Sequence, residues 1–186
     1  LFNIRGSDIA YNPVVISYAM ITQETAKWFV GRERVMKSPG VGEYLKSQGI
    51  EVYDYASFSS ELAAQTGMIW LDEHTASAWI GNHVKADAVW IERSPLVLPK
   101  ACKNPTEVQG MIDAHVIDGV AVTQFLHWLE HHWQSGLTEL SAAQKLRTFR
   151  EQSPLFLGES FRTISGFGPH GAIIHYSVTP RSDRPI

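Results

Sequence analysis

One segment constrains the fold more than any other, because residues 104–133 carry the signals of a single long helix. Asn104 can cap a helix, Pro105 suits its first position, and Glu107 can bond back to the cap. Apolar residues then recur at the three- and four-residue steps of one helix face. The pattern predicts a helix of about 27 residues, roughly 40 Å long at 1.5 Å per residue. The residues on that face are Val108, Met111, Ile112, His115/Val116, Gly119, Val122, Leu126, Leu129 and Trp133.

The chain before this helix has a different texture, in which short apolar runs alternate with short helical patterns. Alternation of this kind is typical of an α/β domain with a largely parallel or mixed sheet. We therefore predict such a domain over residues 1–97. The expected strands are residues 14–21, 28–30, 50–55, 68–71 and 88–91, and the expected helices are residues 39–48, 57–65 and 75–81.

A proline-bounded segment, residues 94–99, is predicted to be extended and to mark the boundary with a second domain over residues 98–186. Within that second domain, Thr138 is expected to cap another helix, which Pro154 closes. The order of elements there is helices first and strands afterwards, an α+β beginning. The two expected strands are residues 161–165 and 172–178, joined by the glycine-rich loop 166–171.

Composition excludes several classes of function. The chain has 186 residues, one cysteine and a net charge of −3, so it offers no internal disulfide, no cysteine-rich zinc module and no polycationic surface for nucleic acid. Its most continuous apolar run, residues 14–21, is far shorter than the ~20 residues of a membrane helix. No secretory signal is visible at the start, and a cytoplasmic location without membrane or nucleic-acid partners is expected.

Three groups of residues could carry chemistry, but a simpler interpretation is favoured for each. His127 and His131 are spaced to share a zinc ion, yet Trp128 stands where an H-E-x-x-H site needs glutamate, and an exposed polar helix edge is favoured. The loop 166–171 lacks the Lys-Ser/Thr pair of a phosphate loop, so a flexible hairpin is expected. Cys102 has no catalytic neighbours in sequence and is interpreted as a structural thiol.

His175 is a stronger candidate, although the residues alone do not decide its role. It lies in an apolar stretch, where histidine is more often a buried residue with satisfied hydrogen bonds than a catalytic group. The glycine-rich turn before it would bring backbone close to a ligand, which favours a functional role.

Three segments together resemble a known family: Leu1-Phe2-Asn3-Ile4-Arg5-Gly6-Ser7-Asp8-Ile9, Lys103-Asn104-Pro105-Thr106-Glu107 with the helix after it, and Thr163-Ile164-Ser165-Gly166-Phe167-Gly168-Pro169-His170-Gly171-Ala172-Ile173-Ile174-His175-Tyr176. In order and spacing they are similar to aminopeptidase P, the Xaa-Pro aminopeptidases of the creatinase/methionine-aminopeptidase "pita-bread" superfamily. Phe167 and His170 depart from the family's pattern, and both are expected in a solvent-facing turn.

The resemblance implies a creatinase-N-like α/β domain followed by the incomplete α+β beginning of a pita-bread catalytic domain. Such enzymes use two divalent ions, usually Mn²⁺, to remove the N-terminal residue from peptides with proline in position two. His175 matches the family's histidine that hydrogen-bonds the substrate near the scissile amide and assists proton delivery. The metal ligands are expected after Ile186, with none in this chain, where Asp183 is the only carboxylate side chain after His175. The isolated chain is therefore predicted to be inactive.

Two alternatives to this interpretation remain open. The lack of metal ligands favours a non-catalytic binding or dimerisation module derived from the family, and the enzyme itself could form a homodimer. A creatinase-like hydrolase of another amide shares the fold, although the segment Arg5-Gly6-Ser7-Asp8 favours the three-domain aminopeptidase. In the isolated chain, the residues from Lys103 onward are expected to expose apolar faces.

Overall fold

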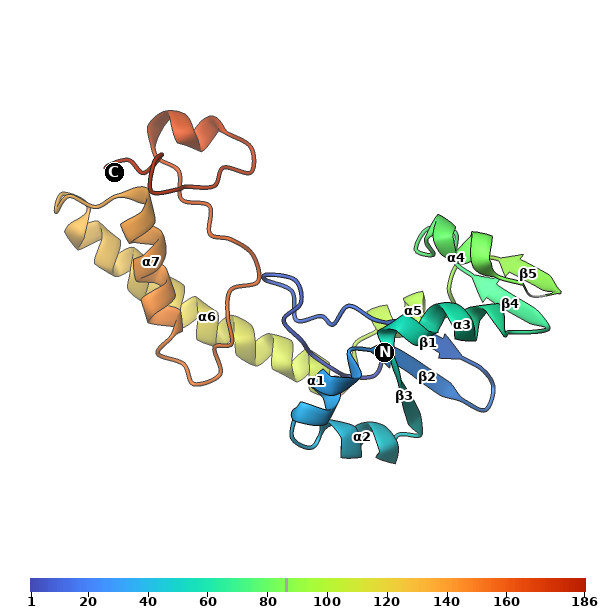
Figure 1. The fold of residues 1–186 in the computed structure, drawn as a ribbon. Helices are drawn as coiled ribbons and strands as arrows, with labels where there is room; N and C mark the ends of the chain where they lie inside the picture. Colours follow the sequence, from blue (N-terminus) through green and yellow to red (C-terminus); the bar gives the residue numbers. More distant parts are fainter. Residues whose placement is uncertain (86) are drawn as a thin grey trace. The chain divides into compact units, whose positions relative to one another are not determined.

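The computed structural model describes residues 1–85 and 87–186, and these form two compact units (Figure 1). The first unit comprises residues 1–9 and 13–102, and the second comprises residues 10–12 and 103–186. Each unit is built around its own elements. The domain boundary expected after residue 97 stays a prediction.

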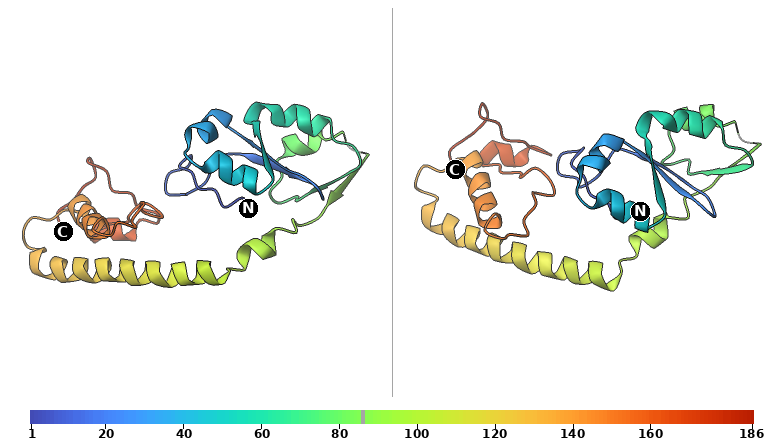
Figure 2. Two further views of the ribbon diagram at one scale, coloured as in Figure 1. Left: turned by 90° about the horizontal axis from the view of Figure 1, so that it is seen from below. Right: turned by 60° about the horizontal axis from the view of Figure 1, so that its bottom comes forward.

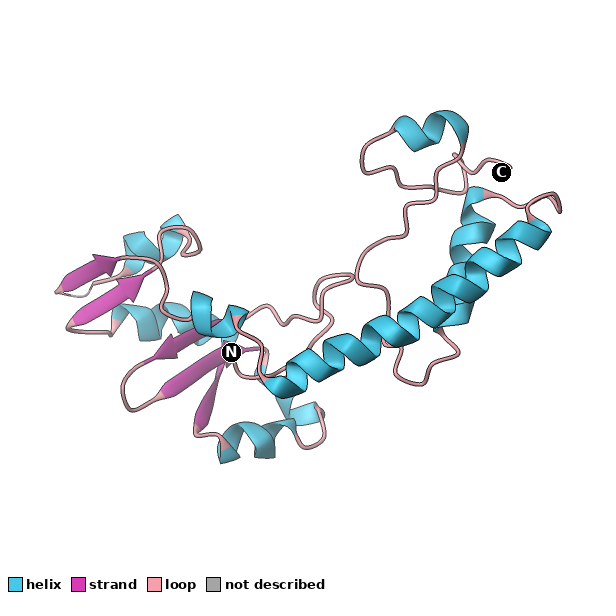
Figure 3. Ribbon diagram, turned by 180° about the vertical axis from the view of Figure 1, so that it is seen from behind, coloured by secondary structure: helices cyan, strands magenta, loops and turns pink. Residues whose placement is uncertain are grey.

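The first unit contains two small sheets, shown as arrows in Figure 3. In the larger sheet the central strand pairs antiparallel with the strand before it and parallel with the strand after it. The strands of the smaller sheet are parallel. A mixed sheet was expected, and the structure confirms it. The larger sheet has the order β1 (Tyr18–Ile21), β2 (Ala26–Val30), β3 (Ile50–Asp54), and the smaller one pairs β4 (Met68–Leu71) with β5 (Ala88–Ile91).

Short helices connect these strands, at positions close to those that the sequence predicts. A helix over Arg32–Lys37 was not expected. The helices are α1 (Arg32–Lys37), α2 (Val41–Ser47), α3 (Phe58–Ala63), α4 (Ala78–His83) and α5 (Val97–Ala101), with a 3-10 turn at Tyr55–Ser57.

Two expectations for the first unit were wrong. The segment 94–99 is not extended throughout, because α5 begins at Val97; Pro99 fits the first turn of this helix, where backbone N–H groups have no helical partner. The strand expected over residues 14–21 begins only at Tyr18. Before it, the Ile16 amide donates to the Asp8 carboxylate at 2.8 Å instead of joining a ladder.

The core of the first unit lies on both faces of β2. Successive residues of a strand point to opposite faces, so Trp28 and Val30 pack on one side and Phe29 on the other. The first pair contacts Val35 and Leu45, whereas Phe29 meets Phe58 and Leu62. Phe29 and Leu45 are fully buried. The central strand is therefore covered on both sides, which stabilises the parallel pairing with β3.

Substitution of Leu45 tests this core. We expect Leu45→Ala to lower the free energy of unfolding by about 2–5 kcal/mol, because it removes a buried side chain and leaves a cavity. Met36→Ala on the adjacent α1 is the matched control, since Met36 is 73% exposed, and it should change stability by no more than about 0.5 kcal/mol. Urea denaturation followed by circular dichroism measures both, and equal losses would contradict this core.

The second unit begins with the long helix that the sequence predicts. α6 (Pro105–His132) has 28 residues and runs without interruption, as Figure 2 shows. The expected capping box is present: the Glu107 amide donates to Asn104 Oδ1 at 2.9 Å, and the Asn104 amide donates to Glu107 Oε2 at 2.8 Å. In the described part of the chain, no helix combines the length and the hydropathy that crossing a bilayer requires.

A second helix, α7 (Glu139–Arg150), packs against α6. The Arg150 guanidinium donates to both carboxylate oxygens of Asp118 on α6, at 2.6 and 3.2 Å. The Lys145 ammonium lies 5.2 Å from the centre of the Trp128 ring, also on α6. The apolar surface expected to be exposed is present as well, for example at Val116, which is 63% exposed.

The two strands expected at residues 161–165 and 172–178 are absent from the described structure. These residues form loops and a 3-10 turn at Gly168–Ala172, and His175 has a left-handed backbone with φ of 55°. A two-stranded hairpin is marginal by itself, and within the described residues no further strand lies beside this segment. Its backbone and side chains are instead held by a buried carboxylate.

Candidate functional site

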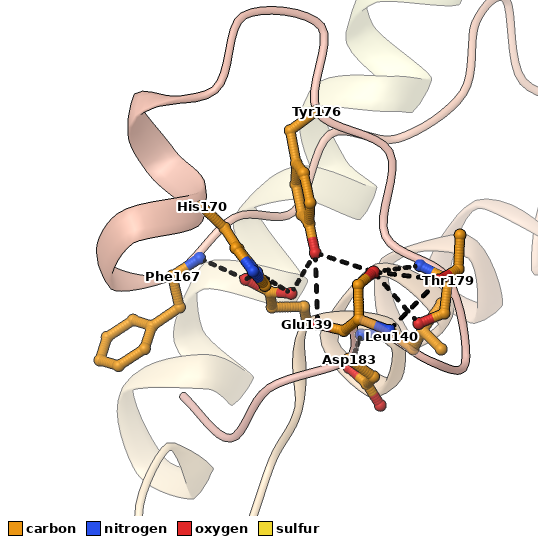
Figure 4. Close-up of polar contacts among 8 residues, drawn as sticks. Glu139, Leu140, Phe167, His170, Tyr176, Thr179 and Asp183 are labelled. Carbon is orange, nitrogen blue, oxygen red and sulfur yellow. Dashed lines mark hydrogen bonds and ion pairs between the residues drawn. The ribbon is translucent and has the colours of Figure 1, made fainter.

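That carboxylate belongs to Glu139, the first residue of α7, and it is completely buried (Figure 4). Its Oε1 accepts a hydrogen bond from the Phe167 amide at 2.7 Å. His170 Nδ1 lies 2.9 Å from Oε1 and 3.0 Å from Oε2. The Tyr176 hydroxyl donates to Oε2 at 2.9 Å. One side chain thus fixes three points of the loop between residues 167 and 176.

Glu139 can occupy this position because the start of α7 is fully capped. The Ser141 amide donates to Thr138 Oγ1 at 3.2 Å, which confirms Thr138 as the cap. The Leu140 amide donates to Asp183 Oδ1 at 3.0 Å, and the Glu139 amide donates to the Arg184 carbonyl at 3.0 Å. Asp183, the only carboxylate side chain after His175, thus satisfies a helix N-terminus, where negative charge is favourable.

The pKa of the Glu139 carboxyl is lowered. Burial alone would raise it, but the hydrogen bonds from Phe167, His170 and Tyr176 favour the ionised form and outweigh that effect. The pKa of the Tyr176 phenol is raised, chiefly because the group is buried and also because it donates to Glu139. The cluster therefore stabilises a buried negative charge.

His175 directly precedes Tyr176 but does not join this cluster. Its side chain is exposed, and the turn that carries it is closed by a bond from the Tyr176 amide to the Ile173 carbonyl at 3.2 Å. Glu139 anchors the tyrosine, so it also restrains the backbone that presents His175. The His175 imidazole is therefore exposed, while the hydrogen bond between Tyr176 and Glu139 restrains the segment that carries it.

His170 was expected in a solvent-facing turn, and this was wrong. Its side chain is only 19% exposed, because it packs against Glu139 and lies 4.5 Å from the Tyr176 ring between ring centres. The ring of Phe167 is 49% exposed as expected, although its amide is held by Glu139. Glu139 itself was not predicted from the sequence to be a site residue. A carboxylate at a helix start gives no local sign that it is buried against a distant loop.

The other candidates are separate from this cluster. Cys102 is a free, exposed thiol at the end of α5, and loop 166–171 contains the 3-10 turn instead of a plain hairpin. His127 and His131 are exposed on α6, where Glu130 lies beside them. Among the described residues, these are the only three His, Cys, Asp or Glu side chains whose ligand atoms all lie within 4.8 Å of one another. Two hard divalent ions need several shared carboxylate oxygens, so the described residues do not fit a dinuclear centre.

Comparison with known proteins gives the family. The model of the Creatinase/Prolidase N-terminal domain matches residues 1–107, more than half of the chain. The chain belongs to this family. The model of Metallopeptidase family M24 matches residues 109–186. The creatinase-type domain followed by the start of a catalytic domain is therefore confirmed.

Relatives of this creatinase-family chain carry aminopeptidase names. It is 38% identical to "Xaa-Pro aminopeptidase 1" of Dictyostelium discoideum, over 95% of this chain and 29% of that protein. It is 31% identical to "Aminopeptidase P1" of Lotus japonicus, over 95% of this chain and 37% of that protein. The chain therefore spans about a third of the length of these relatives.

A solved structure is similar to the same creatinase-family chain. It is the X-prolyl aminopeptidase from Caenorhabditis elegans, described as a cytosolic enzyme with a di-nuclear active site. The two match with a TM-score of 0.88 and 28% identity, over 98% of this chain and 31% of the other. The resemblance to aminopeptidase P is thereby confirmed.

The charge on Glu139 should make the second unit sensitive to acid. A carboxyl with a lowered folded-state pKa stabilises the fold above its ordinary pKa, here 4.5, and loses that contribution as pH falls through the folded value. We expect Glu139→Gln to melt at a lower temperature than the wild type at neutral pH, because its amide N–H₂ faces donors that need an acceptor.

The test is how the difference in melting temperature between Glu139→Gln and the wild type depends on pH. Thermal melts of the full chain should show the gap narrowing as pH falls below 4.5, since the wild type then also loses its carboxylate. Tyr176→Phe removes one donor but keeps the charge, so it should cost less and retain the acid dependence. A gap that stays constant with pH would show that the Glu139 charge contributes nothing.

Proposed function

We propose that this chain is part of a dinuclear-metal Xaa-Pro aminopeptidase, which removes the N-terminal residue from peptides with proline in position two. The observation that carries the proposal is the match of both units to one solved X-prolyl aminopeptidase at a TM-score of 0.88. Curated relatives from a slime mould and a plant bear the corresponding names. Peptides of this type are the proposed partners.

The chain's part in that activity is structural support and substrate binding. Because the described residues do not fit a pair of divalent ions, we expect the isolated chain to be inactive, and no step of hydrolysis is assigned to it. The ions of the whole enzyme, held by residues outside this set, are proposed to be Mn²⁺. Their number is supported by the di-nuclear site named for the worm enzyme.

His175 is proposed as the residue of this chain that contacts the substrate. An exposed imidazole can donate a hydrogen bond near the scissile amide or deliver a proton to the departing nitrogen. Glu139 is the positioning residue, since it holds Tyr176, the neighbour of His175. A site that must bind a peptide needs such a rigid support under an accessible side chain.

We also propose a cytoplasmic location and a homodimer for the whole enzyme. The first is supported by the worm enzyme, which is described as cytosolic. The second accords with the apolar surface exposed along α6, which includes Leu126 at 58%.

The first test is the intact mass of the native polypeptide that carries this sequence in its cells. We expect a mass several-fold above 20.8 kDa, because the relatives are about three times as long as the part matched. A native mass near 20.8 kDa would favour a non-catalytic binding or dimerisation module in its place.

The second test is made in that native polypeptide, by Mn²⁺-dependent cleavage of a Xaa-Pro peptide. His175→Ala should lower kcat/KM by about a hundredfold or more, the contribution expected of a group that moves a proton or stabilises developing charge. His115→Ala, an exposed histidine on α6, is the matched control and should leave activity unchanged. Equal activity of the two variants would remove His175 from the site.

A further inference from the structure

Two histidines and a glutamate share one exposed face near the end of α6. They are His127, Glu130 and His131, at positions i, i+3 and i+4, which a helix brings side by side. One ligand atom from each lies within 4.8 Å of the others. The two imidazole rings are 4.5 Å apart between their centres. The sequence pattern indicated only the histidine pair, and the structure adds the Glu130 carboxylate.

We propose that His127, Glu130 and His131 bind one first-row transition-metal ion, with Zn²⁺ as the representative. Two imidazole nitrogens and one carboxylate oxygen form a ligand set that suits zinc, and three protein ligands leave a position for water. The hard ions Ca²⁺ and Mg²⁺ prefer oxygen ligands and are disfavoured here. The proposal does not rest on the proposed peptidase activity.

The hydrogen bond of His131 prepares this residue for coordination. Its Nδ1 lies 2.7 Å from the His127 carbonyl oxygen, and when Nδ1 donates to that oxygen the lone pair is on Nε2. Metal-bound histidines usually donate their second ring N–H in this way, which fixes the tautomer and the ring orientation. One ligand is therefore oriented before the ion arrives.

The three side chains can close around an ion at little cost. Ligands about 2.0–2.1 Å from a tetrahedral zinc are roughly 3.3 Å from one another, so the present spacing needs only small rotations. All three residues are exposed, which leaves their side chains room for such rotations. Among residues 1–85 and 87–186, no ion pair with Lys or Arg holds the Glu130 carboxylate.

The surroundings leave the remaining coordination positions accessible. His127 and His131 border an open hollow of about 440 Å³, lined also by Trp128 and Phe149. Water or a small ligand can reach the ion from this side. His132 lines the same hollow but is stacked on Trp128, 4.9 Å between ring centres, and does not belong to the ligand group.

Calorimetric titration of the full chain with Zn²⁺ tests the proposal. The titration uses a Cys102→Ser background, because the exposed thiol could bind zinc itself. We expect one equivalent of Zn²⁺ to bind, and His127→Ala and His131→Ala each to weaken binding about tenfold or more. Glu130→Gln should weaken it less, since a neutral amide oxygen is a poorer ligand.

His115→Ala is the matched control. His115 lies on the same helix and makes the same bond, from Nδ1 to the carbonyl four residues earlier at 2.7 Å. Among the described residues it belongs to no group of three ligand atoms, and Asp118, one turn further along, is already paired with Arg150. We expect its loss to leave the affinity unchanged. Thermal melts give a second measurement. Zn²⁺ should raise the melting temperature of the Cys102→Ser protein but not that of the same protein carrying His131→Ala.

Either of two results would overturn the proposal. The first is the absence of saturable Zn²⁺ binding to the Cys102→Ser protein. The second is an equal loss of affinity in His115→Ala and His131→Ala, which would mean adventitious binding to scattered histidines. Circular dichroism should be the same for all variants, since each altered side chain is exposed.

Discussion

The second unit depends on one buried charge. Glu139 has no exposed surface, yet it remains ionised because an amide, an imidazole and a phenol all face it. These donors come from a loop and a short 3-10 turn, so hydrogen bonds to the carboxylate hold this segment in place of pairing between strands. Removing a partner from such a group costs more than the bond is worth, because a buried charge is left uncompensated. The loop and the helix start are therefore mutually dependent.

Local signals made the long helix predictable from sequence, whereas distant partners made the site unpredictable. The capping box of Asn104 and Glu107 involves residues three apart, and its outcome can be read from their identities. The contacts of Glu139 span 28 to 37 residues, and nothing near Glu139 in sequence announces them. Apolar residues around His175 favoured a strand, but strand formation requires a neighbouring strand, which the described residues do not provide beside it.

In the first unit, by contrast, the positions of most strands and helices were predictable from local sequence. Strands β4 and β5 coincide with the expected ranges, because short β-branched and aromatic runs between turn residues leave few other options. The early part of the expected first strand failed for a specific reason: Asp8 captures the Ile16 amide. A side chain that competes for a backbone donor cannot be foreseen from hydropathy. Membership in the creatinase family thus rests on a unit with strong local encoding.

The double burial of β2 has a consequence for how the sheet finds its pairing. In a strand with one solvent-exposed face, a register shift of one residue would expose the apolar side chains to water. The cost of that exposure disfavours the shifted register. This effect is weak in β2, because Trp28, Phe29 and Val30 are buried on both faces of the strand. Shape discriminates instead, since Phe29 lies 5.2 Å from the Phe58 ring and 5.4 Å from the Tyr53 ring, between ring centres. The aromatic contacts of Phe29 thus favour the observed register between β2 and β3, in which Phe29 pairs with Tyr53.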